Sequence, residues 1–323
     1  MKLRHAALLF FGSTMIVGWQ TACTEVQPSS EPDQPPPHRV SPFPGDAQIF
    51  AKGIVSTELP EFAISFSPDG ETVYFNRMPA DRSQVRIWSS SLADGAWSEP
   101  KPLSFSDGKY RDADPFVSPD GTRLYFSSTR PIEGDEPRDY DLWFVEKTGN
   151  GWGKPTNLGE PINSAQREIY STLSKNGNLY FSVFETEGRG VGIYRSVWRN
   201  GSFQAPERLT IGSGMLRVTN PTIAPDESFL LFVSDHEGQA DIYVSRRLAD
   251  GEWAEIETLG PVVNSDYTEF APSVSPDGTT LFFTSERPGV LPENAVEGRP
   301  PGDLYAVSLE AAFGAPALDR SSR

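Results

Sequence analysis

The sequence predicts an all-β chain folded as a β-propeller, mainly because it contains five copies of one sequence repeat. Each copy carries a four-residue turn: SPDG at Ser67–Gly70, SPDG at Ser118–Gly121, SKNG at Ser174–Gly177, APDE at Ala224–Glu227 and SPDG at Ser275–Gly278. A short apolar run follows each turn: Val73–Phe75, Leu124–Phe126, Leu179–Phe181, Leu230–Phe232 and Leu281–Phe283. Repeats of about fifty residues built from short strands are typical of propellers, with one four-stranded blade for each copy.

Residues 1–22 are expected to be a secretory signal peptide. Lys2 and Arg4 give a basic start, an apolar stretch follows, and small residues precede Cys23. The apolar stretch is too short and too interrupted for a transmembrane helix, so we expect the chain to be exported. Cys23 is the only cysteine of the chain and stands where a bacterial lipoprotein is processed, which predicts lipidation. Gln20 replaces the Leu that is usual there, and an ordinary secretory signal is the alternative.

Residues 23–45 are expected to be a tether, residues 46–312 a single propeller domain, and residues 313–323 a C-terminal tail. The tether is rich in proline and poor in bulky apolar residues, so it cannot bury enough surface to fold. The net charge of the whole chain is −16. So acidic a chain is a poor candidate for binding nucleic acid, and anionic lipid repels it. We therefore expect contact with a membrane only through a lipid anchor.

Within each copy the four strands can be placed in order. The inner strand precedes the turn and holds an apolar residue beside it, as at Phe66 and Val117. The apolar run after the turn is the second strand. The third strand carries an aromatic residue at one register: Trp88, Trp143, Tyr194, Tyr243 and Tyr305. An Asp-Gly or Asn-Gly pair then predicts a hairpin into the fourth strand in four of the copies.

The fifth copy has no clear fourth strand of its own. Ile49–Leu59 precedes the first copy and can supply that strand, which would close the ring between the two ends of the domain. Phe313–Leu318 is a weaker competitor for the same place. We expect five blades, with six possible if both end segments build a further irregular blade.

The connections between strands fall on two faces, because neighbouring strands of a blade alternate in direction. The turn face carries the four-residue turns, whereas the loop face carries the long connections, chiefly 130–139 and 287–302, where function is expected. Where the inner strands start on the loop face, the copies carry four carboxylates and three arginines: Glu61, Asp112, Glu168, Glu269, Arg111, Arg167 and Arg217. Symmetry would place them around the mouth of the central channel. They are either ion-paired scaffolding or a ligand- or partner-binding site.

No catalytic residue, metal or cofactor is expected. His236 is the only histidine of the propeller body, which excludes a histidine metal cluster, and the chain has no Gly-x-Ser-x-Gly elbow. A glycan-active hydrolase or lyase using the channel-mouth carboxylates is the alternative. Their recurrence in four of the five repeats favours scaffolding, because a catalytic pair needs two different environments.

The repeats resemble those of TolB-like, WD40-like propellers of the bacterial cell envelope. The resemblance rests on the SPDG turns, on Leu124–Ser128 and Leu281–Ser285 after them, and on Leu158–Ser164 with its echo at Leu259–Ser265. It covers nearly the whole mature chain. It implies a periplasmic or outer-membrane-attached lipoprotein, a non-catalytic scaffold that presents charged loops to an envelope protein or glycan. It carries over no catalytic residues.

Overall fold

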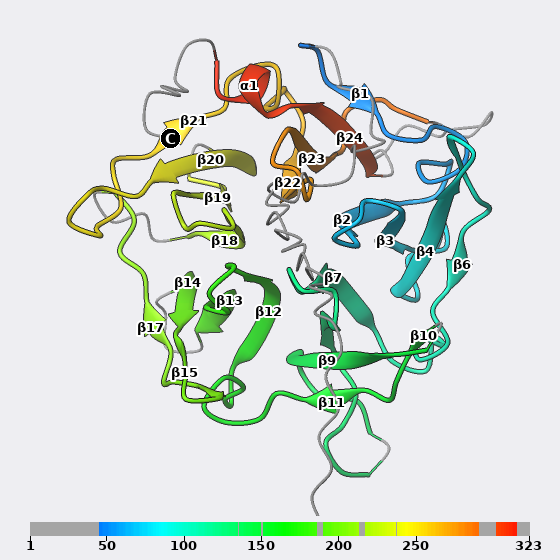
Figure 1. The fold of residues 1–323 in the computed structure, drawn as a ribbon. Coiled ribbons are helices and arrows are strands. Elements are labelled where there is room, and N and C mark those ends of the chain that lie inside the picture. The colour runs from blue at the N-terminus through cyan, green and yellow to red at the C-terminus, as the bar shows by residue number, and fades with distance from the viewer. Residues whose placement is uncertain are drawn as a thin grey trace, which may run out of the picture. The chain divides into compact units, whose positions relative to one another are not determined.

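The computed structural model describes residues 45–134, 136–149, 151–185, 190–212, 217–236, 238–290 and 302–314. These residues form five antiparallel sheets set around a central axis, which confirms the five-bladed propeller (Figure 1). The helix α1 (Leu309–Ala312) is short, and nearly all other regular structure is strand. The expected signal peptide, Cys23 and the tether as far as residue 44 lie outside the described residues.

Each blade runs from an inner strand near the axis to a short strand at the rim. The first blade holds β2 (Glu61–Phe66), β3 (Thr72–Arg77), β4 (Arg86–Ala93), β5 (Ala96–Trp97) and β6 (Lys101–Pro102). The second holds β7 (Asp112–Val117), β8 (Arg123–Ser128), β9 (Asp141–Thr148), β10 (Gly151–Trp152) and β11 (Thr156–Asn157). The third holds β12 (Arg167–Leu173), β13 (Leu179–Glu185), β14 (Gly190–Ser196) and β17 (Glu207–Arg208), with a side hairpin of β15 (Trp198–Arg199) and β16 (Ser202–Phe203). The fourth holds β18 (Thr219–Ile223), β19 (Phe229–Ser234), β20 (Asp241–Arg246) and β21 (Glu257–Thr258).

The fifth blade closes the ring with an N-terminal strand, as the sequence predicts, although this strand lies at the very start of the predicted segment Ile49–Leu59 and shares only Ile49 with it. It holds β22 (Glu269–Val274), β23 (Thr280–Ser285) and β24 (Asp303–Ser308), and its fourth strand is β1 (Gln48–Ile49) from the other end of the domain. Gln48 pairs with Ala306 and Ile49 with Tyr305. The competing segment does not take this place: Phe313 ends α1 and packs on Phe229, and residues 315–318 lie outside the described part.

The four-residue turns are held by their own side chains. In the first turn the Ser67 hydroxyl donates to Asp69 at 2.5 Å and accepts from the Thr72 amide at 2.9 Å. Gly70 takes φ +70°, a left-handed conformation that costs glycine little. The second turn repeats these bonds, because its sequence is the same. The turn is thus a local structure that its four residue types dictate.

Each inner strand also bulges at one residue, which the sequence pattern did not reveal. Its register against the second strand shifts there, and φ lies between +49° and +55° at all five equivalent positions: Ala63, Asp114, Tyr170, Asn220 and Ala271. Such a φ is costly for residues other than glycine unless the surroundings fix it.

Side chains of the preceding blade fix this conformation. The bulge amides of Ala63, Asp114, Tyr170 and Asn220 donate, in that order, to the side-chain oxygens of Thr284, Asn76, Ser127 and Ser182. Each of the four acceptors is the residue directly after the Phe of a second strand. In the fourth blade this position holds Val233, which has no side-chain oxygen. The polar residue after that Phe therefore joins one blade to the next.

Candidate functional site

The four carboxylates predicted at the channel mouth are buried instead. Glu61 is 0 % exposed and accepts from the Thr57 amide at 2.9 Å, the Thr57 hydroxyl at 2.7 Å and Arg77 at 2.7 Å. Asp112 is bound by Arg130 at 2.6 Å. Glu269 is bound by Arg287 at 3.2 Å and by the Ser265 hydroxyl at 2.7 Å. Three of the four carboxylates thus form buried ion pairs inside their own blades.

Glu168 differs from the other three because no ion pair is formed with it among the described residues. One of its carboxylate oxygens accepts from the Ser164 hydroxyl at 2.5 Å, and the other is buried without a partner. Burial raises the pKa of Glu168 to about 7, and the nearby Asp141 and Asp139 act in the same direction. This carboxyl is therefore partly protonated at neutral pH.

The three predicted arginines lie at the surface of the loop face and do not bind those carboxylates. Arg111 donates to the Tyr140 hydroxyl at 3.0 Å, Arg167 to Asp139 at 2.9 Å, and Arg217 to Asp235 at 3.0 Å. The structure thus separates the predicted ring into buried acids and exposed arginines. Parts of the loops 130–139 and 287–302 lie outside the described residues, at 135 and 291–301.

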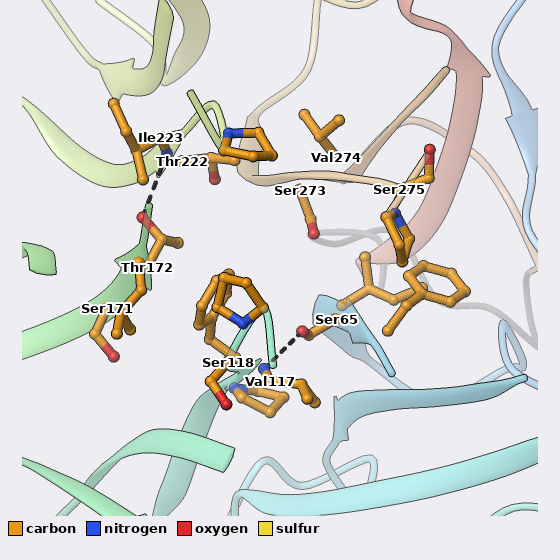
Figure 2. A pocket seen from close by; sticks show the side chains of 18 of the residues that line it. Ser65, Val117, Ser118, Ser171, Thr172, Thr222, Ile223, Ser273, Val274 and Ser275 are labelled. Carbon is orange, nitrogen blue, oxygen red and sulfur yellow. Dashed lines mark hydrogen bonds between the residues drawn. The ribbon is translucent and has the colours of Figure 1, made fainter. Parts of the chain in front are cut away.

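A cavity of about 240 Å³ lies on the propeller axis, between residues of all five blades (Figure 2). Because its lining includes the four-residue turns, it opens on the turn face, the side opposite the one predicted. Residues from all five inner strands and all five four-residue turns line it. Because the blades repeat, its wall consists of three layers. Two of the bulge residues, Asp114 and Tyr170, form the floor, the residues two positions beyond each bulge form the middle, and the second residues of the turns form the rim.

Tyr170 and Asp114 give the floor its chemistry. The buried Tyr170 side chain crosses the axis from the third blade, and its hydroxyl donates to the Pro272 carbonyl of the fifth blade at 2.7 Å. Asp114 accepts from the Ser127 hydroxyl at 3.0 Å. Burial raises the pKa of Asp114 to about 6, although the Ser127 hydrogen bond acts against it. Burial and the Asp114 charge also raise the pKa of Tyr170 well above its ordinary value.

The middle layer carries four hydroxyls and one aromatic ring: Ser65, Thr172, Thr222, Ser273 and Phe116. Figure 2 shows two of the hydroxyls joining neighbouring blades, since Ser65 accepts from the Val117 amide at 3.0 Å and Thr172 from the Ile223 amide at 3.3 Å. Thr222 donates to the Pro272 carbonyl at 2.5 Å. The Ser273 hydroxyl points into the open centre of the cavity.

The rim consists of four prolines and one lysine. Pro68, Pro119, Pro225 and Pro276 come from the SPDG and APDE turns, and Lys175 from SKNG. The Lys175 side chain is exposed, and its amide donates to the Pro225 carbonyl of the next turn at 2.8 Å. Among the residues that line the cavity, those that break the fivefold pattern are Asp114, Phe116, Tyr170 and Lys175, and all of them come from the second and third blades. These departures are the sequence signal that could have located the cavity.

Comparison with known proteins identifies the fold. No family model matches the sequence, and no curated protein matches it. A protein from Agrobacterium tumefaciens assigned to TolB has 21% sequence identity, with 80% of this chain and 79% of that chain covered and a TM-score of 0.50. The chain has the fold of a TolB-like β-propeller. Two further structures have lower TM-scores: a GH62 hydrolase in complex with xylotriose (10% identity, 82% and 98% covered, TM-score 0.48) and Kuenenia stuttgartiensis hydrazine synthase (13%, 80% and 41%, 0.47).

At these identities the likeness concerns the fold alone, so the chemistry of this TolB-like propeller has to come from its own residues. Among the described residues lining the cavity, Asp114 is the one carboxylate and Lys175 the one cation. No group of three or more His, Cys, Asp or Glu residues in the described part is arranged to hold a metal ion. No helix in that part is long and apolar enough to span a membrane. The wall offers hydroxyls, aromatic rings and prolines, which suit binding.

Proposed function

We propose that the protein is an exported, non-catalytic binding protein of the bacterial cell envelope, which receives part of its partner in the axial cavity. The observation that carries the proposal is the cavity itself. It is preformed, open on the turn face and lined by apolar side chains with a few oriented polar groups, which is the usual composition of a binding pocket. The lining residues that depart from the repeat pattern lie on the second and third blades, so this side of the cavity differs chemically from the rest and can select a partner.

A binding role is better supported than that of a glycan-active hydrolase or lyase. Glycoside hydrolysis ordinarily needs two carboxyl groups that reach the same bond of the substrate. The axial cavity offers one, Asp114, among the described residues that line it. Glu61, Asp112, Glu168 and Glu269 are each at most 1 % exposed, so a substrate could reach them only after the surrounding structure opened.

The N-terminal residues supply the location in this proposal. With residues 1–22 removed and Cys23 lipidated, the proline-rich residues 23–45 would join the anchor to the propeller. An extended proline-rich chain spans about 3 Å per residue, so this tether would reach about 70 Å. The acidic body would then stand clear of the lipid surface, and the membrane would be touched only through the anchor. Residues 46–312 would act as one binding domain, followed by a short tail.

The loop face provides a second contact surface in the proposal. Arg111, Arg167 and Arg217 expose their side chains there, and Arg167 and Arg217 are paired with exposed carboxylates. Exposed ion pairs contribute little to stability, so carboxylates of a partner could replace Asp139 and Asp235 as the partners of these arginines with little loss of folding free energy. Charged loops of an envelope partner would therefore meet guanidiniums on this face.

Capture from native envelope extract, with a chain that starts at Asp46, tests the proposal. Ser273→Phe fills the axial cavity, and Arg111→Glu with Arg167→Glu alters the loop face while leaving the cavity intact. We expect one partner, identified by mass spectrometry and glycan analysis, to be retained by the parent chain and lost on Ser273→Phe with its thermal transition preserved. Unchanged capture by Ser273→Phe would contradict the axial site, and loss on the arginine variant alone would move the partner to the loop face.

A further inference from the structure

A groove of about 500 Å³ on the turn face continues the axial cavity outward between the second and third blades. The two share Ser118, Pro119, Leu173 and Lys175, so they form one continuous depression. One wall comes from the second blade, with Arg123 and Lys147. The other comes from the third blade, with Lys175, Trp198 and Phe203. None of the residues expected from the sequence to form a site lies in this groove.

Trp198 is held in place as an exposed aromatic surface. Its side chain is 38 % exposed, whereas most large apolar residues of the described part are covered. The Phe203 ring packs edge-on against it, with centroids 4.7 Å apart. The Trp198 side chain also lies over Gly177, where an added Cβ would come within 3.3 Å of it. The SKNG turn thus leaves room for this indole ring.

The two irregular turns of the chain cooperate to fix the Trp198 backbone. Its amide donates to the Asn178 side-chain oxygen at 3.0 Å, and the Asn178 amide group donates to Glu227 at 2.5 Å. Glu227 is bound in turn by Arg247 at 3.0 Å and Arg195 at 3.3 Å. Glu227 replaces the last Gly of the turn and holds φ +62°, an unfavourable conformation for glutamate. Glu227 of the APDE turn, in its unfavourable backbone conformation, therefore holds Asn178, and Asn178 positions the Trp198 backbone.

Two lysines line this groove outside any ion pair of the described residues, although Asp69 lies near enough to Lys147, and Asp226 near enough to Lys175, to be attracted by them. Lys147 and Lys175 come from opposite walls, and neither forms an ion pair with another described residue. The acids of the groove are already engaged: Arg123 binds Glu146 at 3.1 Å, and Asp120 accepts from its own turn. In a chain of net charge −16, two lysines outside ion pairs that line the same groove as an exposed indole are a local exception.

The backbone of the groove walls is already hydrogen-bonded. The Gly121 amide donates to Ser118, the Lys147 amide to Thr122 and the Gly177 amide to Ser174. An extended peptide, which is usually recognised through backbone pairing at a free strand edge, finds little to pair with there. A sugar ring needs no such pairing, because its apolar face stacks on an indole and its hydroxyls and carboxylates bind side chains.

We infer that this groove binds an acidic oligosaccharide, a chain of pyranose rings that carry carboxylates. One ring stacks on Trp198, and Lys147 and Lys175 bind carboxylates of the neighbouring units. The continuous depression leads the end of the chain towards the axial cavity. The inference rests on the proposed binding function and names the ligand class that the turn face selects.

Calorimetric titration with defined oligomers tests the inference. The probes are hexamers of galacturonic acid and of mannuronic acid, the methyl ester of each, and a hexamer of glutamic acid. We expect at least one uronate hexamer to bind, and its ester to bind at least tenfold more weakly because the lysines then face no charge. Binding should weaken as salt rises, since the attraction between exposed charges is screened.

The variants separate the groove from the axial cavity. Trp198→Ala and the pair Lys147→Gln with Lys175→Gln should each weaken binding of the uronate at least tenfold, whereas Trp198→Phe retains part of it. The matched control is Lys101→Gln with Lys154→Gln, exposed lysines outside the groove, which should bind as the parent does. Ser273→Phe should still bind the uronate, so a failed axial proposal would leave this result standing. Absence of binding by both uronates, equal binding of the ester, or tighter binding of the glutamate hexamer would overturn the inference.

Discussion

Two glutamates at equivalent positions of the repeat differ in what neutralises them. Glu269 is fully buried and binds Arg287, whose side chain is 18 % exposed. Glu168 is equally buried but has Ser164 as its partner, and its pKa is raised to about 7 by burial. A neutral amide should therefore be tolerated at residue 168 and not at residue 269.

The contrast is a prediction for Glu269→Gln and Glu168→Gln, measured by urea unfolding at pH 8. Removal of the Glu269 charge leaves Arg287 partly buried and unpaired, so the free energy of unfolding should fall by about 3 kcal/mol. Glu168→Gln removes a charge that the fold already disfavours, so the free energy of unfolding should stay equal or rise. Equal losses in the two variants would show that Glu168 has a cationic partner.

Asp114 predicts a pH dependence of stability. Its pKa in the folded protein is about 6, above its ordinary value of 3.8, because the wall of the axial cavity partly removes this half-buried carboxyl from water. The folded state therefore holds the proton more tightly than the unfolded chain, and stability falls as pH rises from about 4 to about 6. Above pH 6 the carboxylate is charged in the folded and the unfolded state, and it lowers the free energy of unfolding by a constant amount.

Asp114→Asn should remove this cost. The equivalent residue of the fourth blade is already Asn220, with φ +49°, so the amide suits the bulge. The variant should unfold with a free energy about 2 kcal/mol higher than the parent at pH 8 and close to it at pH 4. Thermal unfolding at the two pH values measures the difference. A variant that is less stable at pH 8 would mean that the Asp114 charge is paired.

At the scale of the element, the bulge depends on the blade before it. The Ser127 hydroxyl accepts from the Tyr170 amide at 3.0 Å and donates to Asp114 at 3.0 Å, so one side chain holds both residues of the cavity floor in place. Ser127→Ala should lower the free energy of unfolding by about 1–3 kcal/mol, because a buried amide loses its acceptor. The exposed Ser91→Ala is the control. A loss no larger than that of the control would show that the bulge fixes itself.

Turns and strands could be read from the sequence because their causes are local. Ser, Pro, Asp and Gly form the turn among themselves, and the apolar run after Leu124 follows from alternation and burial. The bulge at Tyr170 could not be predicted, since its amide is bound by Ser127 of another blade. The axial site was missed for the same reason. The Tyr170 hydroxyl reaches Pro272, which is 102 residues away along the chain.

The predicted charged ring shows the limit of symmetry as an argument. Repetition correctly placed Glu61, Asp112, Glu168 and Glu269 at equivalent starts of inner strands. It could not tell that each side chain folds back under its own loop, as Glu61 does against Thr57. Residues that vary between repeats, such as Lys175 among the prolines of the rim, proved more informative about the cavity than those that recur.

At the scale of the whole propeller, stability depends on closing the ring through its two ends. β1 pairs with β24, and Phe50 beyond it is buried against Phe282 and Trp97, with ring centroids 5.2 and 5.6 Å apart. Further along, the buried Ser56 hydroxyl donates to the Leu304 carbonyl at 3.2 Å. The segment therefore supplies a strand edge, a core side chain and a hydrogen bond across the seam.

A chain that starts at Leu59 should not fold, whereas a chain that starts at Asp46 should. The shorter chain leaves the edge of β24 unpaired and the core around Phe282 open, and an exposed strand edge promotes aggregation. Phe50→Ala in the longer chain provides the intermediate case: it should lose about 3–5 kcal/mol and still unfold in one transition. Circular dichroism during heating, with light scattering, measures both. A single cooperative transition of the chain from Leu59, at the temperature of the longer chain, would show that four blades and an open fifth suffice.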